Sequence, residues 1–123
     1  MILGIGIDIV HISRMRDWRE QRQLLERFYH PDELADAESR GPTVMQSLAA
    51  RFAAKEAYGK ALGTGMRDLR LKDIQVENDQ HGKPTIKLHG SALARFRGIG
   101  GKSIFISLTH ERDNAIAVVV LEA

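Results

Sequence analysis

The sequence predicts an α+β domain in which a largely antiparallel sheet packs with a long central helix. Three observations lead to this prediction. Runs rich in apolar and β-branched residues occur at residues 2–10 and 115–121, and such runs are typical of strands. Strong helix formers dominate residues 43–62. The second half of the chain shows short strand-like segments around turn-forming residues, which is the pattern of antiparallel hairpins.

The composition is that of an ordinary globular domain. A chain of 123 residues with 43% hydrophobic and 28% charged residues fits one folded domain, residues 1–123, and excludes a multidomain enzyme or a disordered chain. The longest aliphatic run is residues 115–121, far shorter than the roughly 18 residues of a membrane span. The absence of cysteine excludes disulfides and thiolate metal sites. Since no secretory signal is recognisable, we expect a cytoplasmic protein.

Residues 2–10 predict a buried strand because they are almost continuously apolar. Alternation places the isoleucines on one face and Gly4, Gly6 and Asp8 on the other. Glycines in a strand often mark the close approach of a ligand or of another backbone. The strand is therefore a candidate floor of a binding site, and tight strand packing around a satisfied aspartate is the alternative.

Residues 14–28 predict one uninterrupted helix, since they contain neither glycine nor proline and Ser13 can cap the start. Arg14, Trp18 and Arg22 recur every four residues and so share one surface. This surface presents two guanidinium groups beside an indole, which makes it a candidate partner-binding face. The alternative is a solvated helix whose tryptophan packs inward.

Two further helices are expected in the middle of the chain. Residues 29–33 break the first helix, and a short acidic helix follows to about Ser39. After a loop at residues 41–42, the longest helix begins at residue 43 or 44 and continues to Leu62. The Gly-Thr-Gly turn at residues 63–65 ends it.

Charged residues interrupt both faces of this long helix. Arg51 and Lys55 share a side with large apolar residues, while Glu56 and Lys60 stack beside alanines. Burying unpaired charge costs several kcal/mol, so we expect a ligand or a metal to offset it. A plain surface pair of Glu56 and Lys60 is the alternative for those two residues. Residues 51–72 carry six basic residues against two acidic ones, which favours an anionic partner such as phosphate, nucleic acid or an acidic protein.

The first predicted hairpin pairs residues 71–78 with residues 84–89 around a polar turn, and a short helix is expected at residues 91–97. The second hairpin pairs residues 103–109 with residues 115–121.

His110 lies at the mouth of this second hairpin. A histidine in that place can contact a ligand, although a lone loop histidine is more often merely exposed.

The charged residues allow one class of chemistry. An aspartate and a helical glutamate without a histidine pair suit a hard cation that keeps several waters and takes other ligands from phosphates. Magnesium fits this description better than zinc. Such a site is suited to phosphoryl-type transfer or hydrolysis.

Two motifs resemble those of a known family. One reads Gly-Ile-Gly-Ile-Asp-Ile-Val at residues 4–10, with Arg14 shortly after it. The other reads Arg-Phe-Ala-Ala-Lys-Glu-Ala at residues 51–57 and continues with Lys-Ala-Leu-Gly-Thr-Gly at residues 60–65. Together they resemble the holo-(acyl-carrier-protein) synthases, the small-class 4′-phosphopantetheinyl transferases.

The resemblance extends across the chain. The first hairpin, with Gly-Lys-Pro at residues 82–84, resembles the family's middle hairpin, and Ser-Leu-Thr-His at residues 107–110 resembles its C-terminal element. Thr109 stands in place of a second serine and keeps the hydroxyl. His30 stands where the family commonly has threonine.

The resemblance implies a magnesium-dependent transfer of 4′-phosphopantetheine from coenzyme A to a serine of an apo-acyl carrier protein. The products would be the holo-carrier and adenosine 3′,5′-bisphosphate, and the activity would support fatty acid biosynthesis. It also implies a phosphopantetheinyl transferase fold that assembles as a homotrimer, with an active site at each subunit boundary. Gly4 and Gly6 would then approach a neighbouring subunit or the pyrophosphate.

Carried over residue by residue, the resemblance makes Asp8 and Glu56 the magnesium ligands. Glu56 would also help to remove the serine proton, and Lys60 would stabilise the leaving phosphate. The turn of residues 63–65 after the helix, with Gly63 and Thr64 as its predicted binding residues, would offer backbone N–H groups near the phosphates. Asp8, Glu56 and Lys60 are thus the predicted catalytic residues.

The same comparison assigns the remaining site residues. Arg51 and His110 would bind the 3′-phosphate of coenzyme A or its surroundings. The surface of Arg14, Trp18 and Arg22 would bind the carrier protein, because acyl carrier proteins are acidic around the modified serine.

Two other functions are disfavoured. The Gly-Ile-Asp-Ile sequence at residues 6–9 resembles the first phosphate strand of sugar-kinase-like ATPases, but those proteins need two large domains. A nucleic-acid-binding module is the other candidate, built on the basic residues 51–72. The aromatic residues are too scattered to form a stacking platform, so we expect no nucleic acid partner.

Overall fold

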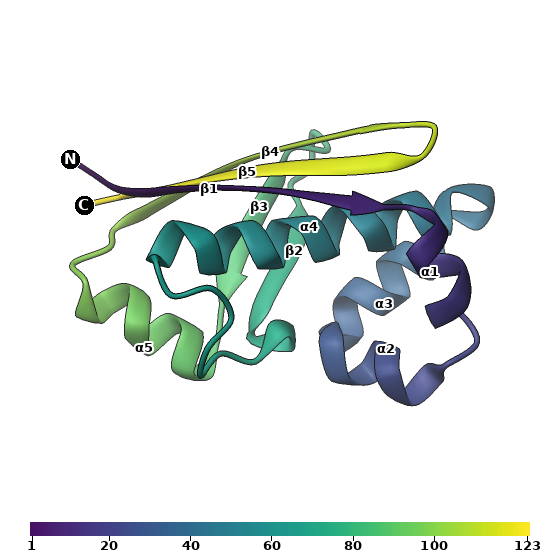
Figure 1. The fold of residues 1–123 in the computed structure, drawn as a ribbon, viewed down its shortest axis with the longest axis horizontal. Helices are drawn as coiled ribbons and strands as arrows, with labels where there is room; N and C mark the ends of the chain where they lie inside the picture. Colours follow the sequence, from purple (N-terminus) through teal and green to yellow (C-terminus); the bar gives the residue numbers. More distant parts are fainter.

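A three-stranded antiparallel sheet covers one side of a long helix in the computed structural model, which describes residues 1–123 (Figure 1). The strands follow the order β1 (Ile2–His11), β5 (Asn114–Glu122) and β4 (Ser103–Glu111), and the helix is α4 (Val44–Leu62). The other elements are α1 (Ser13–Trp18), α2 (Arg22–Phe28), α3 (Pro31–Glu38), η1 (Gly41–Thr43), η2 (Leu71–Asp73), β2 (Ile74–Asn78), β3 (Pro84–Leu88) and α5 (Gly90–Gly98). The predicted α+β class with antiparallel pairing and a long helix is confirmed.

The inner face of the sheet packs against α4. Alternate residues of β5 are inaccessible to solvent because they face the helix, and these are Ala115, Ala117, Val119 and Leu121. Helix α4 presents small side chains in return, and the fully inaccessible ones are Ala49, Ala53, Ala54 and Ala57. Small residues on both surfaces allow the helix to lie close to the sheet.

Gly4 and Gly6 make the closest approach between β1 and α4. A Cβ atom added at Gly6 would lie 1.9 Å from the carbonyl oxygen of Ala57, and one at Gly4 would lie 1.9 Å from that of Ala61. Only glycine fits at such separations. The prediction that these glycines approach a neighbouring subunit or a pyrophosphate is therefore wrong, because the backbone of the chain's own helix fills that space.

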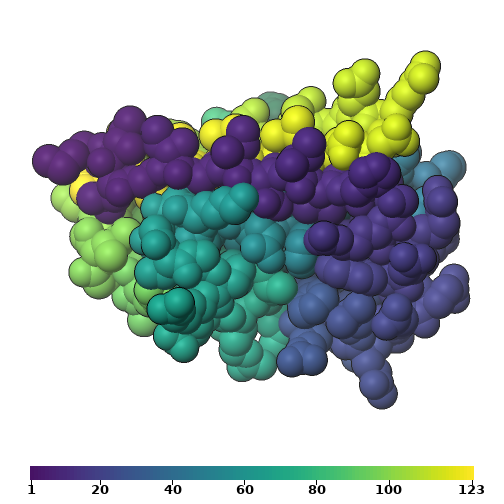
Figure 2. Space-filling view, in the orientation of Figure 1, coloured from purple at the N-terminus to yellow at the C-terminus, as the bar shows by residue number.

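The isoleucines of β1 lie on the outer face of the sheet. Ile5, Ile7 and Ile9 are 62%, 58% and 60% exposed, and Figure 2 shows β1, in purple, at the surface along its length. The prediction of a buried strand is therefore wrong for this face of the isolated chain. Val120 pairs with both Ile5 and Phe105, so the three strands together present apolar side chains outward.

The helix predicted at residues 14–28 is broken in two. Helix α1 ends at Trp18 and α2 begins at Arg22. The rings of Trp18 and Phe28 lie 5.2 Å apart, and both contact Phe52 of α4. In a continuous helix these two residues would be separated by about 15 Å along the axis. The break thus lets both aromatic side chains reach the same point of the core.

At the helix ends one predicted cap is wrong, one cap was not foreseen, and one predicted end is confirmed. Ser13 lies inside α1 and makes no capping hydrogen bond, so the predicted cap is wrong. His30 caps α3 instead: its Nδ1 accepts from the Asp32 N–H at 3.1 Å, while Glu33 accepts from the His30 N–H at 3.0 Å. At the predicted end of α4, Gly63 adopts φ 85°, where glycine is favoured.

The C-terminal half follows the prediction closely. Both hairpins and the short helix α5 are present. The strand predicted from residue 71 begins instead at Ile74, because Leu71–Asp73 form the 3₁₀ turn η2. None of the helices combines the length and apolar character that a bilayer-spanning segment requires.

Candidate active site

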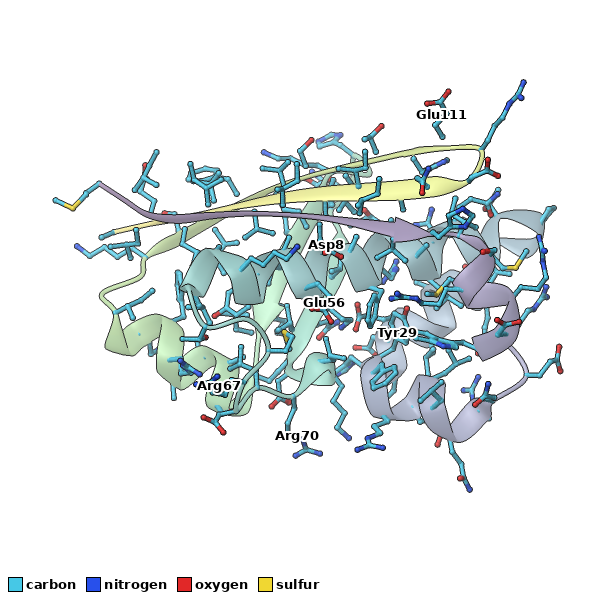
Figure 3. All side chains as sticks on the ribbon, viewed as in Figure 1. Asp8, Tyr29, Glu56, Arg67, Arg70 and Glu111 are labelled. Atoms are coloured by element: carbon cyan, nitrogen blue, oxygen red, sulfur yellow. The ribbon has the colours of Figure 1, made fainter.

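The three predicted catalytic side chains meet between β1 and α4. Asp8 follows Gly6 on the inner face of β1, and Glu56 and Lys60 lie one turn apart on α4. Figure 3 labels Asp8 and Glu56. Lys60 Nζ lies 2.9 Å from Asp8 Oδ1 and donates to the Ile7 carbonyl oxygen at 3.1 Å. The side chain of Asp8 is only 16% exposed, whereas that of Lys60 is 53% exposed. The cluster is therefore half open to solvent.

Glu56 shares the electrostatic environment of this cluster. Burial and, after it, the neighbouring Asp8 carboxylate raise the pKa of Glu56 above its usual value, while the cations of Lys60 and Arg14 act in the opposite direction. Two carboxylates therefore lie close enough to repel each other. A cation bound between them would relieve this repulsion.

The predicted carrier-binding residues do not lie on one continuous helix. The Arg14 guanidinium lies 5.8 Å from the centre of the Trp18 ring and 5.7 Å from that of Phe52, so these side chains stack together. Arg22 belongs to another helix, where it pairs with Glu26 and Glu38. The prediction that Arg22 shares one helix face with Arg14 and Trp18 is therefore wrong, because the helix breaks between Trp18 and Arg22, and the carrier-binding role of all three stays a prediction.

The turn after α4 offers fewer donors than expected. The N–H of Gly63 donates to the Lys60 carbonyl oxygen and that of Gly65 to the Gly59 carbonyl oxygen, each at 3.0 Å. These bonds complete the end of the helix. The Gly63 N–H is therefore engaged within the chain, its contact with phosphate stays a prediction, and Thr64 is the residue of this turn whose N–H has no backbone partner.

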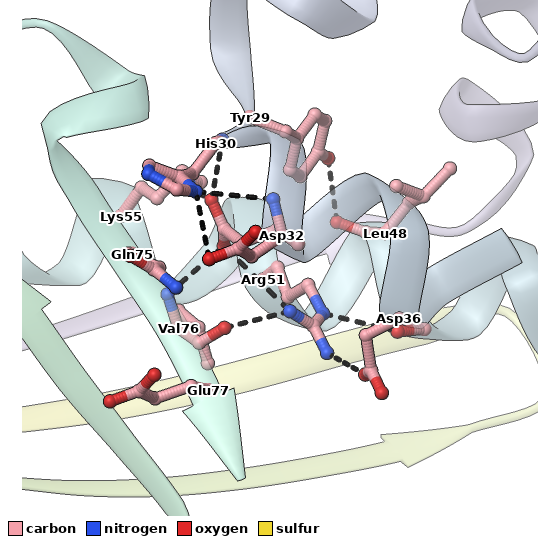
Figure 4. A network of polar contacts seen from close by, with 12 residues as sticks. Tyr29, His30, Asp32, Asp36, Leu48, Arg51, Lys55, Gln75, Val76 and Glu77 are labelled. Carbon is pink, nitrogen blue, oxygen red and sulfur yellow. Dashed lines mark hydrogen bonds and ion pairs between the residues drawn. The ribbon is translucent and has the colours of Figure 1, made fainter. Parts of the chain in front are cut away.

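A buried ion pair links α3 to α4 (Figure 4). Lys55 Nζ lies 2.6 Å from Glu33 Oε1 and donates to the carbonyl oxygens of Leu71 and Ile74 at 2.9 Å and 2.5 Å. Glu33 also accepts from the Val76 N–H at 3.0 Å. Burial lowers the pKa of Lys55 to about 8, although the attraction of Glu33 opposes this shift.

Arg51 is held by the same network. Its Nη1 donates to the Val76 carbonyl oxygen at 2.7 Å, its Nε to Ser47 Oγ at 3.2 Å, and its Nη2 pairs with Asp36. Glu33 Oε2 lies 4.0 Å from Nη1. Burial lowers the pKa of Arg51, and both carboxylates act against the shift. The prediction that a ligand or metal offsets the buried charge of Arg51 is therefore wrong, because the chain's own carboxylates do so.

A cavity of about 160 Å³ lies between α4 and β4. Its polar lining residues are Arg40, Thr43, Gln46, Ser47, Arg51, Asn78 and His110. The structure thus brings Arg51 and His110 to one cavity, as the sequence predicted. His110 belongs to β4 and not to a loop.

The predicted site residues fall into two groups around α4. Glu56 and Lys60 follow Arg51 by five and nine residues, which at 3.6 residues per turn places them about 140° and 180° away around the helix. The cavity at Arg51 and the cluster at Asp8 therefore lie on different flanks of α4. A single chain does not bring all the predicted site residues together.

Sequence reasoning missed the partners of the buried cations. Glu33 and Asp36 lie three residues apart on α3, and Arg51 and Lys55 lie four residues apart on α4. Such spacings place each pair on one face of its helix. Comparison of the acidic face of α3 with the basic face of α4 could therefore have identified these ion-pair partners. Arg40, which lines the cavity, was also missed.

The comparisons with known proteins agree on one family. The family model described as "4′-phosphopantetheinyl transferase superfamily" matches residues 4–119. The holo-[acyl-carrier-protein] synthase of Treponema denticola is 52% identical over 122 residues, which cover 99% of each chain. The crystal structure of the Neisseria meningitidis holo-[acyl-carrier-protein] synthase matches with a TM-score of 0.88 and 37% identity, over 100% of both chains.

A further solved structure is that of a Bacillus anthracis holo-(acyl-carrier-protein) synthase in complex with CoA (3′,5′-ADP). It matches with a TM-score of 0.81 and 35% identity, over 100% of this chain and 98% of that one. The motifs, the fold and these matches over nearly the full length are in agreement. The chain belongs to the 4′-phosphopantetheinyl transferase superfamily, and within it to the holo-(acyl-carrier-protein) synthases.

Proposed function

We propose that this protein transfers 4′-phosphopantetheine from coenzyme A to a serine of an apo-acyl carrier protein in the cytoplasm. The reaction yields the holo-carrier and adenosine 3′,5′-bisphosphate, and it supplies carriers for fatty acid biosynthesis. The observation that carries the proposal is the cluster of Asp8, Glu56 and Lys60, which joins two carboxylates to a partly exposed ammonium group. Family membership supports the same conclusion.

The two carboxylates fit Mg²⁺. Nowhere in residues 1–123 do three or more His, Cys, Asp or Glu side chains gather as a metal site, but Mg²⁺ commonly takes only one or two carboxylates and completes its shell with waters and phosphates. Asp8 and Glu56 would hold the ion. When bound, it supplies charge neutralisation at the pyrophosphate.

The chain's own residues would complete the transfer. Lys60 would donate to the phosphate that leaves as adenosine 3′,5′-bisphosphate, because its ammonium group is fixed by Asp8 and the Ile7 carbonyl. Glu56 is the group placed to help remove the serine proton. Thr64 would offer its free N–H beside these groups.

We infer that the active form is a homotrimer in which one coenzyme A contacts two subunits. The Asp8 cluster and the Arg51 cavity lie on different flanks of α4, so residues from adjacent copies are needed to complete the site. The outer sheet face, with Ile5, Ile7 and Ile9 exposed, is an apolar surface of the kind that partner subunits cover. Sedimentation equilibrium measures the number of chains per particle, and a fully active monomer would rule this arrangement out.

Carrier docking is proposed at Arg14 and Trp18. Arg14→Gln is expected to raise the KM for the carrier about tenfold and to leave the KM for coenzyme A nearly unchanged, since it removes a cation that attracts an acidic partner. Arg22→Gln is the matched variant. It is expected to change the carrier KM less, because Arg22 already pairs with Glu26 and Glu38. Equal effects of the two substitutions would place the docking surface elsewhere.

Mass spectrometry of the carrier tests the function directly. Apo-acyl carrier protein incubated with the purified protein, coenzyme A and Mg²⁺ should gain the mass of one phosphopantetheine group, and the gain should require the divalent ion. A carrier whose modifiable serine is replaced by alanine is the control. No mass gain under these conditions would refute the proposed function.

A further inference from the structure

We propose that a groove between the end of α2 and residues 66–72, called here the α2 groove, binds a fatty acid. The alkyl chain would lie on its apolar floor and the carboxylate on its positively charged rim. The groove has a volume of about 520 Å³, which is within the range of about 300–1,000 Å³ for small-molecule sites. It shares no residue with the Asp8 cluster or the Arg51 cavity. Binding itself does not depend on the transferase function, whereas its effect on the reaction rests on that proposed function.

The rim of the α2 groove carries positive charge that the chain does not balance. Arg27, Arg70 and Lys72 line the groove, and no carboxylate does. The arginines and lysines that pair with a carboxylate are elsewhere in the chain: Arg22, Arg40, Arg51, Lys55 and Lys60. Part of the basic excess of residues 51–72 is therefore free to attract an anion.

The floor of the α2 groove is apolar. Its members are Phe28, Met66, Leu69 and Leu71. All four residues are half-buried, so part of each remains in contact with water in the isolated chain. Covering such surface with an alkyl chain is favourable because it removes apolar area from water. An apolar floor beside a positive rim therefore suits a molecule with one apolar and one anionic end.

The chemistry of the groove favours a fatty acid over other anions. A guanidinium group binds a carboxylate through paired hydrogen bonds, and the rim offers two guanidinium groups and one ammonium group. A nucleotide would place its polar base and ribose on a floor that has no polar side chain to receive them. Figure 3 shows Arg70 on the side of the molecule away from the three-stranded sheet. Assembly through the outer sheet face would therefore leave the groove open.

Phe28 connects the α2 groove to the surface proposed for carrier docking. Its ring lies 5.2 Å from that of Trp18 and 6.1 Å from that of Phe52, and the Arg14 guanidinium stacks with these same two rings. A fatty acid that contacts Phe28 would disturb this aromatic cluster. Under the proposed function, we expect bound fatty acid to raise the KM for the carrier and to leave the KM for coenzyme A unchanged.

Calorimetric titration with sodium dodecanoate, below its micelle concentration and without coenzyme A or carrier, tests the site. We expect saturable binding of one molecule per chain. Decanoate should bind on the order of tenfold more weakly, because it buries two fewer methylene groups. Trp18 is the only tryptophan of the chain and contacts Phe28, so its fluorescence should change in parallel with the heat of binding.

Two double variants test the charged rim. Arg70→Gln combined with Lys72→Gln removes two of the three rim cations and should weaken dodecanoate binding about tenfold or more. Arg97→Gln combined with Lys102→Gln is the matched control, since it removes two exposed cations that do not line the groove. This control should bind dodecanoate like the wild-type protein. Thermal melting verifies that both variants are folded.

The outcomes separate this inference from the proposed function. No saturable binding to the wild-type protein, or equal affinities of the two double variants, would overturn the inference and leave the transferase function standing. A raised carrier KM in the Arg70 and Lys72 variant, without dodecanoate binding to the wild-type protein, would assign the groove to the carrier and overturn it as well. Binding that leaves the carrier KM unchanged would support the site and exclude its effect on docking. Dodecanoate binding without any mass gain of the carrier would support the site and refute the transferase function.

Discussion

Asp8→Asn and Glu56→Gln are each expected to reduce phosphopantetheine transfer on the order of 10³-fold or more. Each change removes one of the two carboxylates that would hold Mg²⁺, while the shape of the side chain is kept. The fold should survive, because neither residue belongs to the buried network around Glu33. Initial rates of carrier modification, followed by mass spectrometry at saturating coenzyme A, measure the loss.

Asp17→Asn is the matched control for this prediction. Asp17 is an exposed aspartate on α1, so its amide variant makes the same chemical change outside the cluster and should retain full activity. Circular dichroism and melting temperature confirm that all three variants are folded. Wild-type activity in Asp8→Asn or Glu56→Gln would refute the metal assignment.

Glu33→Ala is expected to destabilise the protein by about 3–5 kcal/mol. Glu33 is 1% exposed and is the shared partner of Lys55 and Arg51, so its removal leaves two buried cations without compensation. A loss of this size approaches the total stability of many small domains, which is about 5–15 kcal/mol. Urea denaturation followed by circular dichroism measures the free energy of unfolding.

Two further variants keep this prediction testable if Glu33→Ala does not fold. Glu33→Gln preserves the shape and should still be strongly destabilised, whereas Glu38→Gln, which affects an exposed pair with Arg22, should change stability by less than about 1 kcal/mol. Lys55→Met added to Glu33→Gln should recover part of the loss, because it removes one of the unpaired charges. Similar stabilities of Glu33→Gln and Glu38→Gln would contradict a stabilising network.

The sequence predicted the elements whose signals are local. Helix α4 was recognised from its helix formers and the Gly63 end signal, and both hairpins from their alternation and turns. The helix at residues 14–28 was predicted wrongly because its break serves a tertiary contact, the joint packing of Trp18 and Phe28 on Phe52. Local propensity contains no information about such a contact.

The site could be predicted only in part, because its contacts join residues that are far apart in the sequence. Asp8 and Glu56 are far apart in the sequence, and their proximity was inferred from motifs and not from periodicity. The partners of Arg51 and Lys55 depend on how α3 packs against α4, which no spacing within one helix reveals. The angular separation of Arg51 from Glu56 and Lys60 follows from their spacing on α4, whereas the cavity that Arg51 lines depends on how β4 packs against the helix.

The close contact of Gly4 and Gly6 with α4 bears on how substitution data for this protein should be read. Asp8 lies on the same strand face, two residues beyond Gly6, so any side chain at Gly6 would lift the strand from the helix and carry the aspartate away from Glu56. In a saturation-mutagenesis screen scored by growth, both glycines would therefore be as intolerant as the acidic residues, although they bear no functional group. Low tolerance of substitution at a position can therefore reflect the distance between strand and helix as well as the chemistry of a side chain.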